Sequence, residues 1–202
     1  MNIDIFCAVE TWLTSDIPSK LISTDYTLIR QDRTKRKGKN GTKRAGGVFI
    51  AYKSFLKVTQ VRNIIIPDLI EAVFAKFSMN SEKILIGSIY IPPPVNAEKL
   101  NQLDTILESI DKVRDQYTSV LILGDFNYNL EKNNRLSTIF QSQMLQNFIH
   151  EHTRQNSILD LCLTDTPDLI KQCKITENIS TTCDHLAISV QLHIPKKKTD
   201  IF

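Results

Sequence analysis

The chain has 202 residues and a formal net charge of +3, with 42% hydrophobic and 23% charged residues. This composition is ordinary for a globular protein, and the length is sufficient for one domain with a substantial hydrophobic core. It excludes a highly charged disordered chain. The small net charge neither requires nor opposes a polyanionic partner.

Residues 3–10 (IDIFCAVE) form the first apolar, β-prone run, and we expect a strand there. The segment lacks a basic region and carries Asp4 and Glu10, so it is not typical of a signal peptide. No apolar run approaches the ~18 residues that a membrane span requires. The four cysteines include no CxxC pair, which argues against a structural zinc site. The sequence therefore predicts a reduced, intracellular protein without a membrane partner, and it leaves the oligomeric state open.

Further strands are expected wherever β-branched and aromatic residues form short apolar runs. The run at 83–91 stops at Pro92, and the run at 157–164 encloses a single acidic residue, Asp160. In chain order, the strands expected after the first are 45–52, 69–79, 83–91, 119–126, 157–164 and 186–194.

Two helices are expected between these strands. Apolar residues recur at spacings of three and four from Leu100 to Val113, which makes one apolar stripe. Asn96 or an adjacent residue could cap this helix. A similar pattern predicts a second helix at 136–150. Because strands outnumber helices and several follow one another directly, the sequence favours two packed sheets with helices outside over a doubly wound parallel sheet.

A basic stretch at 33–44 (RTKRKGKNGTKR) contains seven basic residues and no apolar side chain. We expect a mobile loop that is either simply solvated or in contact with phosphate groups. Its candidate nucleic-acid contacts are Lys35, Arg36, Lys37, Lys39, Lys43 and Arg44. A second basic cluster, residues 196–198, lies in a predicted basic tail at 196–202, so that residues 1–195 form the single domain.

Polar residues lie at or near the ends of several predicted strands. In sheet proteins adjacent strand ends share one rim, and ligands commonly bind there. Carboxylates suit a hard cation such as Mg²⁺, and a histidine with a carboxylate partner suits catalysis. Tyrosine and asparagine side chains can hold phosphate oxygens. Together these groups predict phosphodiester hydrolysis by metal-activated water, and they are Glu10, Tyr90, Asp125, Asn127, Asp160, Asp184 and His185.

Each of these residues also has a purely structural interpretation. Asp125 and Asn127 follow a glycine, which is typical of a turn. Glu10 could open a helix or a turn, and Tyr90 could simply be a packing residue. Asp160 is harder to explain in this way, because an aspartate among isoleucine and leucine residues is at least partly buried and needs a partner.

Six segments in order resemble the endonuclease/exonuclease/phosphatase superfamily: VETWL, RAGGVFIAY, SIYIPP, LILGDFN, SILDLCLT and CDHLAISV. The resemblance is closer to the endonuclease domain of non-LTR retrotransposons, which is similar to apurinic/apyrimidinic endonucleases. GDFN with a downstream DH is its most specific element. It implies an α/β fold of the α+β type, namely a four-layer sandwich of two mostly antiparallel β-sheets flanked by helices.

The resemblance also implies a metal site and a phosphate contact. Glu10 in VETWL matches the family's ligand for Mg²⁺, for which Mn²⁺ could substitute. Asp184 in CDHLAI matches a residue beside the metal and the attacking water. Tyr90 in SIYIPP matches the residue that hydrogen-bonds the scissile phosphate.

The remaining matched residues are implied to carry the proton transfers. Asp125 in GDFN matches the residue that orients or activates the attacking water, and Asn127 supports the same site. Asp160 in SILDL matches the carboxylate that pairs with the catalytic histidine, which is His185. The implied reaction cuts one DNA strand and leaves a 3′-hydroxyl. A reverse transcriptase encoded in the same parent reading frame could extend that end, and the site of action would be the nucleus.

Two departures from the family pattern matter. The family normally begins with a strand that carries an asparagine of the metal site, and this chain starts only nine residues before Glu10. We therefore expect that strand to be absent, which would expose backbone groups and apolar surface. The family usually has serine where this chain has Cys183, and a thiol is a weaker hydrogen-bond donor, so the orientation of Asp184 could loosen.

Two other functions remain open from the sequence. One is a catalytically impaired retroelement fragment that only binds nucleic acid, which the expected missing strand motivates. The other is a phosphoesterase of the same superfamily that acts on a phosphoinositide or a sphingolipid. No segment typical of a membrane-contacting surface is visible in the sequence, which disfavours this lipid substrate.

Overall fold

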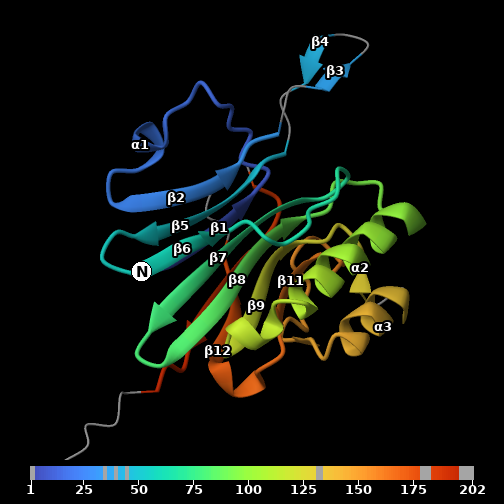
Figure 1. Cartoon of the computed structure of the whole chain (residues 1–202). Coiled ribbons are helices and arrows are strands. Elements are labelled where there is room, and N and C mark those ends of the chain that lie inside the picture. Colours follow the sequence, from blue (N-terminus) through green and yellow to red (C-terminus); the bar gives the residue numbers. More distant parts are fainter. Residues whose placement is uncertain are drawn as a thin grey trace, which may run out of the picture.

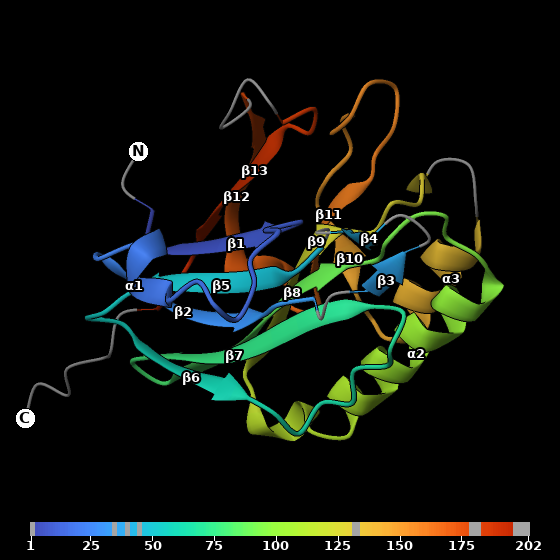
Figure 2. The ribbon, with the colours of Figure 1, turned by 90° about the horizontal axis from the view of Figure 1, so that it is seen from above.

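The computed structural model describes residues 3–33, 36–38, 41–43, 46–130, 134–177 and 183–195. Figure 1 shows two β-layers packed face to face, with α2 (Ala97–Asp111) and α3 (Asn134–Ser142) on the outer side of the larger layer. The short helix α1 (Ser19–Ile22) lies beside the smaller layer (Figure 2). The fold is therefore the sandwich of mostly antiparallel sheets and flanking helices that the sequence predicts.

The larger layer is a six-stranded sheet with the strand order β10-β11-β9-β8-β7-β6. Its β8 and β9 are parallel, and the other neighbouring pairs are antiparallel. Strands β7 to β9 are buried on both faces, which is why their sequences are almost continuously apolar. The strands are β6 (Lys57–Val61), β7 (Glu71–Met79), β8 (Glu82–Tyr90), β9 (Ser119–Asp125), β10 (Gln146–Asn147) and β11 (Asp160–Thr164).

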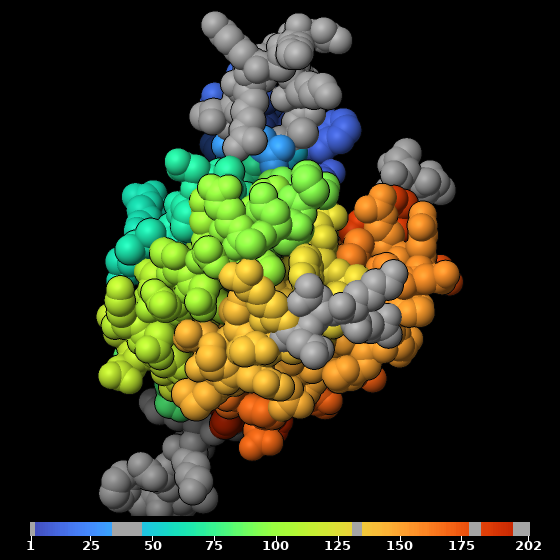
Figure 3. Space-filling view, turned by 90° about the vertical axis from the view of Figure 1, so that its right-hand side faces the viewer, coloured from blue at the N-terminus to red at the C-terminus, as the bar shows by residue number. Residues whose placement is uncertain are grey.

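Helix α2 connects the parallel strands β8 and β9. The N-cap residue of α2 is Asn96, whose Oδ1 accepts a hydrogen bond from the backbone N–H of Lys99 at 3.0 Å. The buried residues of α2 recur at spacings of three and four, as predicted, and are Leu100, Leu103, Ile106, Leu107, Ser109 and Ile110. A short 3-10 helix, η1 (Arg114–Gln116), follows α2. Figure 3 shows the yellow-green surface of α2 next to the golden surface of α3.

The smaller layer consists of a three-stranded sheet in the order β1-β5-β2 and a two-stranded sheet of β12 and β13. All of these pairs are antiparallel. Val48 and Ile50 of β5 are completely buried and belong to the same hydrophobic core as the larger sheet. The elements are β1 (Ile5–Val9), β2 (Tyr26–Gln31), β5 (Val48–Lys53), the 3-10 helix η3 (Pro167–Leu169), β12 (Ile170–Thr176) and β13 (Ala187–Leu192).

Within the described residues, four strands of the smaller layer have one unpaired edge each, and they are β1, β2, β12 and β13. Strand β1 hydrogen-bonds to β5 alone, and β13 hydrogen-bonds to β12 alone. All five residues of β1 are apolar, yet each is only half-buried. The expected absence of the family's first strand stays a prediction, and the free edges of β1 and β13 offer backbone groups with which a further strand could pair.

The predicted second helix at 136–150 is too long. Helix α3 ends at Ser142, and Met144 then adopts a positive φ of 55°. The N–H of Leu145 donates to the carbonyl of Phe140, and the N–H of Met144 donates to that of Gln141. These two bonds are a helix C-terminal turn of the Schellman kind. Met144 and Leu145 therefore belong to this turn, and Phe148 and Ile149 lie in the segment that follows β10.

The basic stretch also differs from the expected loop. Residues 36–38 and 41–43 pair as a short hairpin of β3 (Arg36–Gly38) and β4 (Gly41–Lys43). Lys35, Lys39 and Arg44 lie outside the described residues, as does the predicted tail at 196–202. Within the described residues, no helix has the length and apolar content needed to cross a membrane.

Candidate active site

One rim of the larger sheet collects three of the predicted site residues. Tyr90 and Asp125 are the last residues of the parallel strands β8 and β9, and they are neighbours in the strand register. Asp160 is the first residue of β11, which runs antiparallel to β9, and it lies directly opposite Asp125. The ends of three strands therefore place these side chains at the same edge.

Gly124 allows β9 to approach β8 closely just before this rim. Its φ is +155°, a conformation that other residues rarely adopt, and an added Cβ would lie 1.8 Å from the carbonyl oxygen of Ile89. Only glycine fits such a close contact. The GDFN segment thus combines a required glycine with the carboxylate that follows it.

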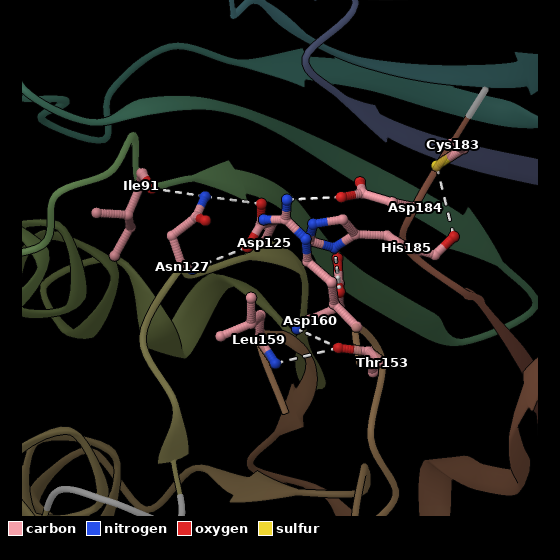
Figure 4. A network of polar contacts seen from close by, with 10 residues as sticks. Ile91, Asp125, Asn127, Thr153, Leu159, Asp160, Cys183, Asp184 and His185 are labelled. Atoms are coloured by element: carbon pink, nitrogen blue, oxygen red, sulfur yellow. Dashed lines mark hydrogen bonds and ion pairs between the residues drawn. The ribbon is translucent and has the colours of Figure 1, made fainter. Parts of the chain in front are cut away.

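Asp125 is buried and is held by Asn127. Its Oδ1 accepts a hydrogen bond from the backbone N–H of Asn127 at 2.8 Å, and its Oδ2 accepts one from Nδ2 of the same residue at 2.7 Å. Nδ2 of Asn127 also donates to the carbonyl of Ile91 at 3.2 Å. Figure 4 shows Nδ2 of Asn127 between the carbonyl of Ile91 and the carboxylate of Asp125. The turn and the polar site are therefore one structure, since a positive φ of 48° at Asn127 bends the chain back onto Asp125.

His185 is paired with Asp160. Nδ1 of the imidazole lies 2.7 Å from Oδ2 of Asp160, and both side chains are mostly buried. The hydrogen bond to Asp160 raises the pKa of His185, although burial acts in the opposite direction. An Nδ1–H that donates to Asp160 leaves Nε2 on the far side of the ring, where it can meet a ligand.

The carboxylate of Asp125 is electrostatically perturbed. Burial, followed by the repulsion of Asp160, raises the pKa of Asp125 to about 7. The backbone hydrogen bond from Asn127 and the charge of His185 act in the opposite direction, and Glu10 adds a smaller repulsion. Such a carboxyl group exchanges a proton close to neutral pH, which suits acid–base catalysis.

Glu10 approaches the same rim from β1. The hydroxyl of Tyr90 donates a hydrogen bond to Oε1 of Glu10. Burial first, and then this bond, raise the pKa of Tyr90, so its hydroxyl stays protonated. The loop after Glu10 is fixed by paired glycines, because the N–H groups of Thr11 and Trp12 donate to the carbonyls of Gly47 and Gly46.

Asp184 stands at the outer side of the site. Its Oδ2 forms an ion pair with Nη2 of Arg154 at 2.6 Å, and its side chain is 61% exposed. The thiol of Cys183 donates to the backbone carbonyl of His185 at 3.4 Å (Figure 4). Asp184 therefore lies next to the histidine in sequence but has a basic partner of its own.

The donor groups of the rim are suited to a divalent cation. Asp125, Asp160 and His185 each offer one ligand atom, and these three atoms lie within 4.8 Å of one another. Glu10 adds a carboxylate whose charge is felt at Asp125. An accumulation of carboxylate oxygens fits Mg²⁺ or Mn²⁺. The assignment of Glu10 and Asp184 as the metal ligands stays a prediction.

Several residues of the site were not identified from the sequence. Thr153 is completely buried, and its hydroxyl accepts the N–H groups of Leu159 and Asp160, both at 3.1 Å. Arg154 pairs with Asp184, as described above. Both lie in the polar segment HEHTRQNS, which has no periodicity to set them apart. They become recognisable only when the chain folds them against Asp160.

Comparison with known proteins gives one family and many structural relatives. The sequence family described as "Endonuclease-reverse transcriptase" (Exo_endo_phos_2) matches residues 84–189, about half of the chain. This range contains β9, β11 and all but the first two residues of β8, and therefore most of the rim. No curated protein matches the chain.

Among the solved structures, the endonuclease domain of TRAS1, a telomere-specific non-LTR retrotransposon, is 18% identical, with a TM-score of 0.64 over 87% of this chain and 83% of that chain. The 3′ phosphatase NExo from Neisseria, bound to a product DNA hairpin, is 13% identical, with a TM-score of 0.67 over 95% and 89% of the two chains. The human Nocturnin catalytic domain is 12% identical, with a TM-score of 0.65 over 93% and 81%. At these identities, the likeness is one of fold.

Proposed function

Because this chain belongs to the Endonuclease-reverse transcriptase family of the endonuclease/exonuclease/phosphatase superfamily, we propose that it is a magnesium-dependent DNA endonuclease. It would nick one strand and leave a 3′-hydroxyl and a 5′-phosphate. Members of the superfamily are hydrolytic enzymes, and the solved relatives include both an endonuclease and phosphatases. The choice of DNA as substrate follows the retrotransposon relative and stays part of the proposal.

The pair of Asp160 and His185 beside the buried carboxylate of Asp125 carries this proposal. In its ionised form Asp125 would take a proton from the attacking water, whose oxygen forms the new bond to phosphorus. The bond from phosphorus to the 3′-oxygen breaks, and that oxygen takes up a proton from solvent water. His185, held by Asp160, would face the phosphate with Nε2 and stabilise its negative charge.

The other predicted residues would bind the phosphate or the divalent cation, or would orient Asp125. Tyr90 would hold a phosphate oxygen with its hydroxyl, which currently donates to Glu10. Glu10 and Asp184 would hold the divalent cation, which supplies charge neutralisation at the phosphate when it is bound. Asn127 would keep Asp125 in place through its two hydrogen bonds.

Nicking of supercoiled plasmid tests this function. The purified chain with Mg²⁺ should convert supercoiled DNA to the open circular form, and EDTA should prevent it. Asp125→Asn and His185→Ala should each lower the rate by at least about 10²-fold. Asp111→Asn and His150→Ala change exposed residues of the same types, and they should leave the rate within about twofold. Equal rates for the site variants and the surface variants would refute the proposal.

The ends of the nicked strand test the remaining details. A 3′-hydroxyl should allow a DNA polymerase or a reverse transcriptase to extend the nick without prior treatment. A reverse transcriptase from the same parent reading frame is the partner that we propose for this product, in the nucleus. Release of inorganic phosphate from a soluble inositol phosphate, with plasmid left intact, would instead favour a phosphoesterase of small substrates.

A second candidate function is nucleic-acid binding without cleavage. The unpaired edges of β1 and β13 favour it, because Glu10 directly follows an edge strand whose residues are only half-buried. This candidate predicts salt-sensitive DNA binding and no magnesium-dependent nicking by the chain as given. Nicking at a rate that depends on His185 would exclude it.

A further inference from the structure

Arg154 holds a position at the rim that the predicted mechanism does not use. Its Nη2 lies 2.6 Å from Oδ2 of Asp184, and the two side chains are 38% and 61% exposed. Within the described residues, Asp184 is the only acceptor that this guanidinium contacts. A guanidinium has five N–H donors, so one carboxylate oxygen leaves most of them for another ligand.

The loop that carries Arg154 is firmly attached to the catalytic strands. The backbone N–H groups of Thr153 and Arg154 donate to the carbonyl of Ser157, and the N–H of Ser157 returns a bond to Arg154. Thr153 is buried against the start of β11 through its hydroxyl, as described above. The N–H of Leu186 donates to the carbonyl of Thr153 at 2.8 Å. Arg154 is therefore presented by a rigid loop that is bonded both to Asp160 and to the segment that follows His185.

The carboxylates of the rim repel a polyanion, so a cationic side chain at this place favours the binding of one. Carboxylates of four residues collect around the rim, and two of them, Asp160 and Glu10, repel the charge of Asp125. The charge of Arg154 is felt at His185, since it acts to lower the pKa of the imidazole. Among the described residues, Arg33 also lies near the rim, over the ring of Tyr90, but it is already paired with the buried Glu71.

We propose that Arg154 binds a phosphate group of the substrate DNA strand beside His185, and that Asp184 orients its guanidinium. The inference rests on the proposed function, because it takes DNA as the ligand. A planar guanidinium presents paired N–H donors that match two phosphate oxygens. One edge of the group would stay on Asp184, while the solvent-exposed remainder meets the phosphate. Arg154 is then a substrate-binding residue, and Oδ2 of Asp184 positions it, which leaves Oδ1 of Asp184 for the proposed cation.

A purely structural role for the same ion pair gives a different expectation. If the pair only ties the loop at 153–157 to the loop that carries His185, then breaking it from either side should have the same effect. If Arg154 binds phosphate, the substitutions of Arg154 and of Asp184 should change the affinity for DNA in opposite directions. Loss of Arg154 removes an attraction to DNA, whereas loss of the Asp184 charge removes a repulsion.

The experiment measures binding without catalysis. A fluorescein-labelled 20-base-pair DNA duplex is titrated with the full chain in EDTA at several salt concentrations, and anisotropy gives the Kd. Arg154→Ala should weaken binding about tenfold and should reduce the slope of log K against log salt by about one. The Kd of Arg154→Lys should lie between those of the unsubstituted chain and of Arg154→Ala, because lysine keeps the charge and loses the paired donors. Asp184→Asn keeps an oxygen that can accept a hydrogen bond from the guanidinium and loses only the negative charge, so it should bind DNA as well as the unsubstituted chain or more tightly.

The control is Arg62→Ala, which removes the same charge from an exposed residue next to β6, at the other edge of the larger sheet. It should change the Kd by less than about twofold. Equal losses in Arg154→Ala and Asp184→Asn would overturn the inference in favour of a tether. An Arg154→Ala chain that binds like Arg62→Ala, or an unsubstituted chain that does not bind the duplex, would also overturn it.

Thermal unfolding and circular dichroism of each variant identify any loss of fold, and Arg154→Lys and Asp184→Asn test the inference if Arg154→Ala does not fold. The result is separable from the proposed function. A chain that binds DNA through Arg154 but does not nick plasmid would uphold the inference and reject the activity. If the unsubstituted chain nicks plasmid and Arg154→Ala has an unchanged Kd for DNA, the activity is upheld and the inference is rejected.

Discussion

Asp160 is the cross-strand partner of Asp125 and at the same time holds Nδ1 of His185 at 2.7 Å. A single carboxylate therefore acts on both neighbours, because it raises the pKa of Asp125 by repulsion and the pKa of His185 by attraction. The register of β9 against β11 sets this relationship. A shift of one residue would turn one of the two aspartates to the opposite face of the sheet.

Replacement of Asp160 tests this double role. Asp160→Asn keeps the shape of the side chain but removes the charge that orients and stabilises the imidazole. We expect the nicking rate to fall by about 10²–10⁴-fold. The pKa of Asp125 should at the same time move down towards its ordinary value. Single-turnover nicking over a pH series measures both effects, and a rate within threefold of the unsubstituted chain would contradict the first.

The raised pKa of Asp125 predicts how stability depends on pH. The pKa of this carboxyl group is raised from the ordinary value of 3.8 to about 7 in the folded chain. Its contribution to the stability of the fold is therefore fully present below about pH 4 and is lost as the pH rises through about 7. The free energy of unfolding should fall across this range by up to about 4 kcal/mol. The pKa of His185 is also raised from its ordinary value of 6.5, so the stability that this residue contributes is likewise lost as the pH rises above 6.5.

Urea denaturation in EDTA between about pH 5 and pH 8 measures this dependence. Asp125→Asn should flatten the decline, because its amide does not titrate. The exposed control Asp111→Asn should preserve it. A decline that is equally steep in Asp125→Asn would show that Asp125 titrates at an ordinary pKa.

The contact of Tyr90 with Glu10 predicts the metal requirement. If Glu10 holds the cation, Glu10→Gln should raise the Mg²⁺ concentration at half-maximal nicking by about 10–100-fold. Tyr90→Phe removes only the hydroxyl that binds Glu10, and it should give a smaller increase together with a lower maximal rate. Magnesium titrations of both variants measure this, and an unchanged midpoint in Glu10→Gln would exclude Glu10 as a ligand.

Gly124 and Ser88 give opposite expectations for stability within neighbouring strands. Gly124→Ala would place a Cβ 1.8 Å from the Ile89 carbonyl oxygen, and the required shift of β9 should cost more than about 3 kcal/mol. Ser88→Ala removes a buried hydroxyl that has no hydrogen-bond partner within the described chain, so it should be neutral or slightly stabilising. Thermal unfolding of the two variants should separate them clearly.

Local pattern was sufficient for much of the fold. The apolar runs identified β1, β5, β7, β8, β9, β11 and β13, and the apolar stripe with Asn96 identified α2. The strands that were not expected have polar residues or little length. Strand β6 (KVTQV) lies at a sheet edge with most of its residues exposed, and β10 has two residues. Such strands form because a neighbour offers backbone partners, which no local pattern records.

For the site, the order of residues was enough to identify which chemical groups are available. It supplied a glycine followed by Asp125 and Asn127, and an aspartate in an apolar run that needs a partner. The contacts became visible in the folded chain, where Asp160 contacts both Asp125 and His185. There the hydroxyl of Tyr90 also bonds Glu10, and Arg154 pairs with Asp184. The reason is physical, because charge effects between carboxylates depend on distance and burial. Residues far apart in the chain acquire both only when parallel and antiparallel strands end at the same rim.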